Sequence, residues 1–192
     1  MDQIKIRDQL SNQQLILTLL VMEDANDIYQ AILASQTALS AFPASLPWTL
    51  LKPSMQSTLE YCQKHRLAIQ QQIAFHYVIR LQRSHQFVGM IAIQQIRWDI
   101  PSITLSFWGN IHFKGQGYMT QALQLFVEYL KTDMQVKRID AFVDMENESA
   151  KRLCLRANFI LEEVMEHAAK HPVDSSLRNI GVYVVVCRDN KI

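Results

Sequence analysis

Apolar residues recur with two different periods along the chain, and each period predicts one kind of secondary structure. In residues 119–130 the apolar side chains stand three or four positions apart, which is typical of a helix with one buried face. Residues 73–81, 87–96 and 103–108 are apolar runs separated by short polar turns, which predicts three consecutive strands. The middle of the chain is therefore expected to form a three-strand meander followed by a helix.

The remaining elements are expected on both sides of this meander. Further strands are expected at residues 15–20, 138–145, 159–165 and 181–187, and further helices at 28–34, after 52–54 and after a cap at Asn147. Because a helix joins strand 103–108 to strand 138–145, these two strands should run parallel. The expected order is β-α-α-β-β-β-α-β-α-β-β, an α+β fold with one mixed sheet. No repeat or linker divides the chain, so one domain over residues 1–192 is expected.

Composition narrows the class of protein. The chain has 192 residues, 49% of them hydrophobic and 19% charged, with a formal net charge of +1. This is ordinary globular composition, and the near-zero charge argues against nucleic acid as a direct partner. The three cysteines are far apart, which is typical of free thiols in a reducing compartment. No signal pattern and no bilayer-length apolar run are present, so a cytoplasmic protein without a membrane partner is expected.

The segment between the third meander strand and the next helix contains two glycines one residue apart. Its residues are Lys114, Gly115, Gln116, Gly117, Tyr118, Met119 and Thr120. Such a loop turns tightly and points successive N–H groups at the helix N-terminus, which favours a bound phosphate. The segment lacks the Gly-Lys-Ser/Thr ending of a P-loop and the third glycine of a dinucleotide fingerprint. A lone Gly-x-Gly also fits a plain left-handed turn before a helix.

Three sequence segments together resemble the GNAT superfamily of acetyl-CoA-dependent acyltransferases. They are Thr104-Leu105-Ser106-Phe107-Trp108, Lys114-x-x-Gly117-x-Met119, and Asp144-Met145-Glu146-Asn147 followed by Ala150, Leu153, Arg156 and Phe159. The likeness runs from residue 15 to about residue 186. It is strongest to the Rim-type branch, which acetylates N-terminal α-amines of ribosomal proteins and has relatives that act on small amines.

The resemblance implies a GNAT-like fold and a site for acetyl-CoA as co-substrate. The implied cofactor-binding residues are Phe107, Trp108, Gly109, Asn147 and the seven loop residues 114–120. Backbone N–H groups near residues 108–110, where the two parallel strands part, would hold the pantetheine arm and the acetyl oxygen.

The chain departs from the family at the positions that usually carry acid–base groups. Thr104 replaces a common acidic residue, Ala150 a serine and Cys154 a tyrosine. Ser149 and Asp99 are therefore the candidate catalytic residues. A serine in a first helical turn is also typical of capping, and an aspartate beside a proline is typical of a turn.

Trp48 and Trp98 stand in irregular segments and are candidates for binding the acceptor, although half-buried packing fits them equally. His167 and His171 are expected to be solvated loop residues, and no metal is predicted. The leading function is transfer of acetyl to an amine, first a protein N-terminal α-amine and second a small amine or antibiotic. A third interpretation is a CoA-binding sensor or scaffold without turnover. A monomer and a homodimer both fit.

Overall fold

One mixed sheet joins all the strands of the computed structural model, which describes residues 6–43 and 46–187. The eight strands of these residues are β1 (Gln9–Ser11), β2 (Leu15–Leu19), β3 (Phe75–Leu81), β4 (Phe87–Arg97), β5 (Ser102–Gly109), β6 (Arg138–Asp144), β7 (Ile160–Lys170) and β8 (Leu177–Val186). Their order across the sheet is β1-β2-β3-β4-β5-β6-β8-β7, and every neighbouring pair is antiparallel except β5 and β6. The predicted mixed sheet and its parallel pair are confirmed.

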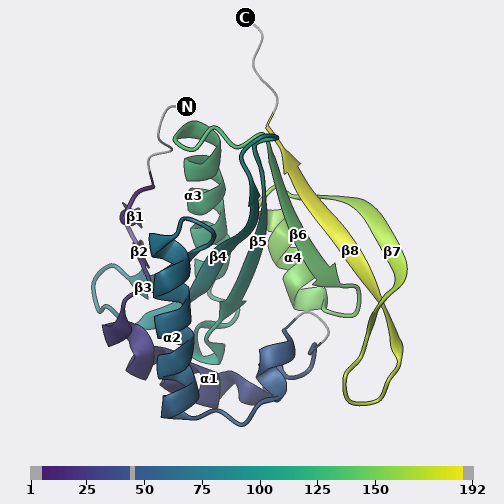
Figure 1. Cartoon of the computed structure of the whole chain (residues 1–192), viewed down its shortest axis with the longest axis horizontal. Helices are drawn as coiled ribbons and strands as arrows, with labels where there is room; N and C mark the ends of the chain where they lie inside the picture. The colour runs from purple at the N-terminus through teal and green to yellow at the C-terminus, as the bar shows by residue number, and fades with distance from the viewer. Residues whose placement is uncertain (1–5, 44–45, 188–192) are drawn as a thin grey trace, which may run out of the picture.

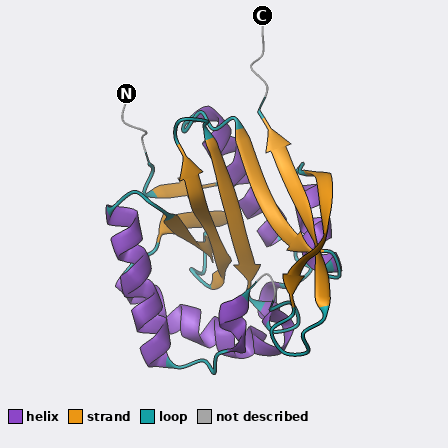
Figure 2. Cartoon of the chain, turned by 45° about the vertical axis from the view of Figure 1, so that its right-hand side comes forward, coloured by secondary structure: helices purple, strands orange, loops and turns teal. Residues whose placement is uncertain are grey.

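Helices cover both faces of this sheet (Figure 1). The α-helices are α1 (Ala25–Leu39), α2 (Met55–Gln70), α3 (Tyr118–Thr132) and α4 (Glu148–Arg156), and short 3-10 helices are η1 (Met22–Asp24), η2 (Pro47–Leu50) and η3 (Ile111–Phe113). Figure 2 shows the strands between the two sets of helices.

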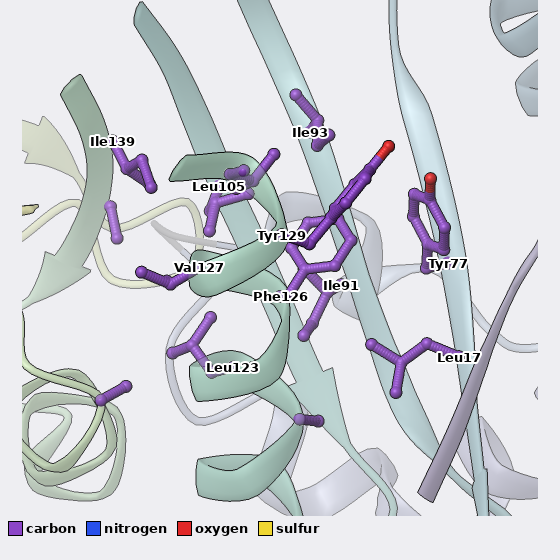
Figure 3. Packing of buried hydrophobic residues seen from close by; sticks show 14 of the residues in the cluster. Leu17, Tyr77, Ile91, Ile93, Leu105, Leu123, Phe126, Val127, Tyr129 and Ile139 are labelled. Atoms are coloured by element: carbon purple, nitrogen blue, oxygen red, sulfur yellow. The ribbon is translucent and has the colours of Figure 1, made fainter. Parts of the chain in front are cut away.

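The two faces bury separate hydrophobic clusters. The periodic face of α3 packs Leu123, Phe126 and Val127 against sheet residues such as Ile91 and Leu105 (Figure 3). On the opposite face, residues of α1 and Cys62 of α2 pack against Val78, Phe87, Met90 and Trp108. Since side chains alternate along a strand, even-numbered residues of β3, β5 and most of β4 face α1 and α2. The alternation is reversed at Phe87 and Val88, where the β3–β4 register shifts.

Four elements differ most from the sequence prediction. Strand β1 was not predicted, because only Leu10 of its three residues is buried. Helix α1 begins at residue 25 and ends at 39, and the Asp24 carboxylate accepts from Val21 N–H instead of capping it. Strand β7 continues to residue 170 and β8 begins at residue 177, because the two strands pair with each other as far as Lys170 and Leu177.

Candidate active site

The predicted glycine loop adopts the left-handed conformation that two glycines permit. Gly115 has φ 80° and Gly117 has φ 81°, in a region that other L-residues rarely occupy. The first hydrogen bond of α3 runs from Gln121 N–H to the Gly117 carbonyl at 3.1 Å. At the entrance of the loop, Ile111 N–H donates to the buried Ser35 hydroxyl of α1 at 2.9 Å. This contact fixes the loop against the α1 side of the molecule.

Five N–H groups of this loop make no hydrogen bond to the described part of the chain. They belong to Gly115, Gly117, Tyr118, Met119 and Thr120, and none of them has a hydrogen-bond partner within the described part of the chain. The first turn of α3 contains no acidic residue, and a Cβ built on either glycine would meet open space. Unpaired donors at a helix N-terminus attract negative charge, so the loop can hold an anionic group such as a pyrophosphate.

The two parallel strands separate beside this loop. The β5–β6 ladder pairs Ser102 with Arg138 through Leu105 with Ala141, and the strands then continue without pairing (Figure 1). Asn110 N–H donates to the Val88 carbonyl of the β4 side at 2.8 Å. Because backbone groups alternate along a strand, those of Phe107 and Gly109 point the other way, into the opening between β5 and β6. This free strand edge can pair with an extended, amide-containing ligand.

Met119 fills the space above two glycines of neighbouring strands. A Cβ on Gly109 would lie 3.1 Å from Met119 Cγ, and one on Gly89 would lie 2.8 Å from Met119 Sδ. The side chain of Met119 thus has a packing role, and only its backbone N–H faces the predicted anion site. Tyr118 packs against Phe113 at a ring distance of 6.0 Å.

Asn147 caps the helix on the other side of the opening. Its Oδ1 accepts from Ala150 N–H at 3.0 Å, as the sequence predicts for a cap. Two residues of the adjoining turn are fixed by Arg178, which donates to the buried Asp144 carboxylate at 3.0 Å and pairs with Glu146 at 2.6 Å. Ser149 is exposed in the first turn of α4, so Asn147 and Ser149 both lie at the start of this helix.

Two adjoining pockets lie on the α1–α2 face of the sheet. The larger has a volume of about 400 Å³ and is lined mainly by α1, η2 and α2. The smaller, of about 120 Å³, reaches β3, β4 and the end of β5. Both include Trp48, Tyr61 and Trp108, and the two indole rings meet edge to face at 5.8 Å. The predicted residues Trp48 and Trp108 are therefore brought together, and Trp108 also belongs to the core.

Sequence reasoning missed a cluster of three side chains in the smaller pocket. Tyr61 and His65 come from α2 and His76 from β3, and the Tyr61 hydroxyl lies 3.2 Å from His76 Nδ1. The imidazole rings of His65 and His76 stack with centroids 3.7 Å apart. The available signal was His76 itself, a polar residue inside an apolar run.

Three predicted residues lie away from this region or inside the core. Asp99 and Trp98 stand in the turn before β5, while the glycine loop follows the end of β5, roughly 25 Å away along eight residues of strand. Asp99 is exposed beside Arg97 at 3.8 Å, and Trp98 lines neither pocket. These positions argue against roles in catalysis and acceptor binding. Cys154, at the family's tyrosine position, is fully buried, and burial raises its pKa to about 12.

The two histidines considered for a metal lie at the β7–β8 hairpin. His167 stands within β7 with φ 54°, so the expectation of a loop residue was wrong there, and His171 pairs with Asp174 at 3.0 Å. Residues 6–43 and 46–187 contain no group of three or more His, Cys, Asp or Glu side chains arranged to hold a metal ion. No helix in the same ranges is both long and apolar enough to cross a membrane.

Comparison with known proteins gives one family. The model of the acetyltransferase (GNAT) domain matches residues 14–160. A ribosomal-protein-serine acetyltransferase of Escherichia coli (strain K12) is 24% identical over 141 residues, which are 73% of this chain and 76% of that protein.

Solved structures share the fold at low identity. RimL, a ribosomal L7/L12 α-N-protein acetyltransferase in complex with coenzyme A, aligns with a TM-score of 0.81 and 21% identity, over 91% of this chain and 95% of that one. The microcin C7 self-immunity acetyltransferase MccE, in complex with acetyl-CoA and AMP, aligns with a TM-score of 0.81 and 18% identity, over 91% and 93%.

Proposed function

The chain belongs to the GNAT family of acetyltransferases, and we propose that it transfers acetyl from acetyl-CoA to the N-terminal α-amine of a protein. The observation that carries this proposal is the set of unpaired N–H groups at the start of α3, beside the opening between β5 and β6. These two features fit the two parts of coenzyme A that a protein recognises through its backbone. The loop suits the pyrophosphate, and the free edge of β5 suits the amide groups of the pantetheine arm.

In this proposal the chain acts mainly by holding two reactants in line. The amine nitrogen forms a bond to the acetyl carbon and the carbon–sulfur bond breaks. The nitrogen loses one proton, the departing thiolate takes up one proton, and the products are the acetylated amine and the free thiol of CoA. Backbone N–H groups at the end of β5 face the opening where charge develops on the acetyl oxygen. Orientation of bound reactants can supply roughly 7–11 kcal/mol, so the altered residues Thr104, Ala150 and Cys154 do not preclude turnover.

The choice of acceptor rests on relatives. The Escherichia coli relative is named for ribosomal-protein serine, and RimL for α-N-protein acetylation. Acetyl transfer to a small amine is the second candidate. It is favoured by the 400 Å³ pocket, whose volume is within the range of small-molecule sites, and by the likeness to MccE.

A matched pair of glutamine variants tests the proposed cofactor site. Gln116 of the loop and Gln124 of α3 are both exposed, and each donates through Nε2 to a backbone carbonyl, at 3.0 and 2.8 Å. Gln116→Glu places a negative charge beside the anion site and should weaken acetyl-CoA binding about three- to tenfold by calorimetry. Gln124→Glu loses the same kind of hydrogen bond and gains the same charge, but two helical turns away from the loop. The acetyl-CoA affinity of this variant should therefore stay within about twofold of the parent value. Equal affinities for both variants would remove the loop from the cofactor site.

A peptide screen tests the acceptor. Peptides with a free N-terminal serine should be acetylated on the α-amine, as mass spectrometry of the product would show, and peptides with a blocked N-terminus should not react. Acetylation of small amines alone would favour the second candidate.

A further inference from the structure

The smaller pocket combines buried polar atoms that lack partners with a place beside the opening between β5 and β6. His76 is only 2% exposed, yet its Nε2 has no hydrogen-bond partner among residues 6–43 and 46–187, and neither has the buried Nδ1 of His65. Burying an imidazole nitrogen without a hydrogen-bond partner costs free energy, because the hydrogen bond that it makes to water in the unfolded chain is not replaced. Both histidines line the same small pocket, so a ligand that enters it could supply the missing hydrogen bonds.

The pocket is close to the place where the acetyl group is expected. Its lining includes Ser106, Phe107 and Trp108, the same part of β5 whose edge faces the opening. The pocket lies on the α1–α2 face, whereas the glycine loop begins α3 on the other face. A ligand in the pocket and a thioester threaded through the opening would therefore approach each other from opposite faces of the sheet.

The chemistry of the lining selects for a neutral ligand group. Among the residues that the structure describes, the small pocket is lined by aromatic, aliphatic, amide, hydroxyl and imidazole side chains, with no aspartate, glutamate, lysine or arginine. Burial lowers the pKa of His65 to about 4 and that of His76 to about 3, so both rings are neutral near pH 7. An ammonium group would find no counter-ion here and would pay a large desolvation cost. A neutral amine carries no charge, so its desolvation costs much less free energy, and its N–H groups can donate hydrogen bonds in the pocket.

We propose that Tyr61, His65 and His76 form the subsite that holds the amino nitrogen of the acceptor in its neutral form, through hydrogen bonds to the unpaired imidazole nitrogens. This inference rests on the proposed function and adds the residues that receive the acceptor. The stacked rings and the Tyr61–His76 hydrogen bond fix the imidazoles in place. The adjoining 400 Å³ pocket, with Lys52, Glu60 and Lys64 in its lining, leaves room for the rest of the acceptor.

Matched tyrosine variants provide the first test. Tyr61→Phe removes one hydroxyl from the cluster, and Tyr129→Phe removes one from the α3 face, where the Tyr129 hydroxyl accepts from Arg7 N–H. With a free N-terminal serine peptide as acceptor, Tyr61→Phe should raise KM for the peptide about threefold or more. Tyr129→Phe should leave it unchanged, and both variants should bind acetyl-CoA like the parent.

Replacement of His76 gives a stronger effect with a rescue. His76→Leu keeps the buried position apolar and should raise the peptide KM at least tenfold, with acetyl-CoA affinity retained. His76→Gln restores a polar group and should recover part of the loss. An unchanged KM in folded His76→Leu, shown by its thermal unfolding, would overturn the proposal.

A binding measurement separates this inference from the proposed function. In protein labelled with ¹⁵N-histidine and saturated with CoA, the ring resonances of His65 and His76 should shift on addition of the serine peptide, and not with its acetyl-blocked form. If the parent fails to acetylate the peptide, the proposed acceptor is wrong, and the same titration with a small primary amine as probe still decides the subsite. No shift with either amine would overturn it.

Discussion

Gly89 and Gly109 lack side chains because Met119 and the adjoining strand occupy the space beside them. A Cβ on Gly89 would run into the Trp108 carbonyl oxygen as well as Met119 Sδ, whereas a Cβ on Gly109 would meet chiefly the flexible Met119 side chain at 3.1 Å. The carbonyl belongs to the β4–β5 ladder and cannot move without disturbing it. The two positions should therefore differ in their tolerance of a methyl group.

We expect Gly89→Ala to lower the free energy of unfolding by about 2–3 kcal/mol, and Gly109→Ala by about 1 kcal/mol or less. Urea unfolding at fixed pH measures both. Adding Met119→Ala should recover most of the loss at Gly109 and little of the loss at Gly89, since the Trp108 carbonyl remains. Equal losses at both glycines, or full recovery at Gly89, would show that Met119 alone sets the limit.

Helix α4 depends on one side-chain oxygen at its start. Asn147 Oδ1 accepts from Ala150 N–H, and the helix spans only nine residues. Asn147→Ala should cost about 1 kcal/mol of stability, whereas Asn147→Asp keeps the accepting oxygen and should cost little. Calorimetry of acetyl-CoA binding to the same two variants tests whether Asn147 also contacts the cofactor. If the amide nitrogen also contacts the cofactor, both variants lose acetyl-CoA affinity; unaltered binding in Asn147→Asp limits the residue to capping.

The elements that sequence predicted well are those whose signal is local. The glycines of the loop, the apolar period of α3 and the Asn147 cap each lie within a few residues, and all three are found where expected. The parallel pair followed from the connecting helix. Strand β1 was missed because three residues with one buried side chain carry too little periodicity.

The acceptor side of the site was harder to predict, because its residues meet only after folding. Tyr61 and His65 lie on α2 and His76 on β3, and no motif relates their spacing. Asp99 shows the opposite error: it borders the right strand, but at the end away from the loop. The sequence indicated that β5 borders the site, but only the folded sheet shows which end of β5 lies at the opening.

The molecule as a whole places its two expected ligands on opposite faces of one sheet. The loop that we propose to bind the pyrophosphate begins α3, and the pocket with the two histidines lies under α1 and α2, with the separated ends of β5 and β6 between them. The pocket therefore places polar side chains, among them the two imidazoles, inside the α1–α2 half of the protein. Their burial should make the stability of the fold depend on pH.

The buried histidines should cause a loss of stability on mild acidification. Both have folded pKa values below the 6.5 of an ordinary histidine, at about 4 for His65 and about 3 for His76. Between pH 6.5 and about 4 the unfolded chain therefore binds protons that the folded chain does not, so stability is complete above pH 6.5 and falls as the pH drops. Each histidine contributes a slope of up to about 1.4 kcal/mol per pH unit in this window. The exposed acids Glu148 and Glu162, whose pKa values are lowered from 4.5 by charged hydrogen bonds to Lys151 and Arg138, add to the loss of stability only as the pH falls to about 4.5 and below, so they contribute little between pH 7 and 5.

Urea unfolding at pH 7, 6 and 5 should show this slope in the parent protein. His76→Leu removes one of the two groups, so its slope should be smaller by about one proton, near 1.4 kcal/mol per pH unit. His112→Asn replaces an exposed histidine of η3 and is the control for the loss of any one histidine. Its free energy of unfolding should depend on pH as in the parent protein. Equal slopes in the parent and in His76→Leu would mean that His76 takes up a proton in the folded protein as readily as in the unfolded chain. The pocket would then accommodate a positive charge, and its selectivity for a neutral amine would fail with it.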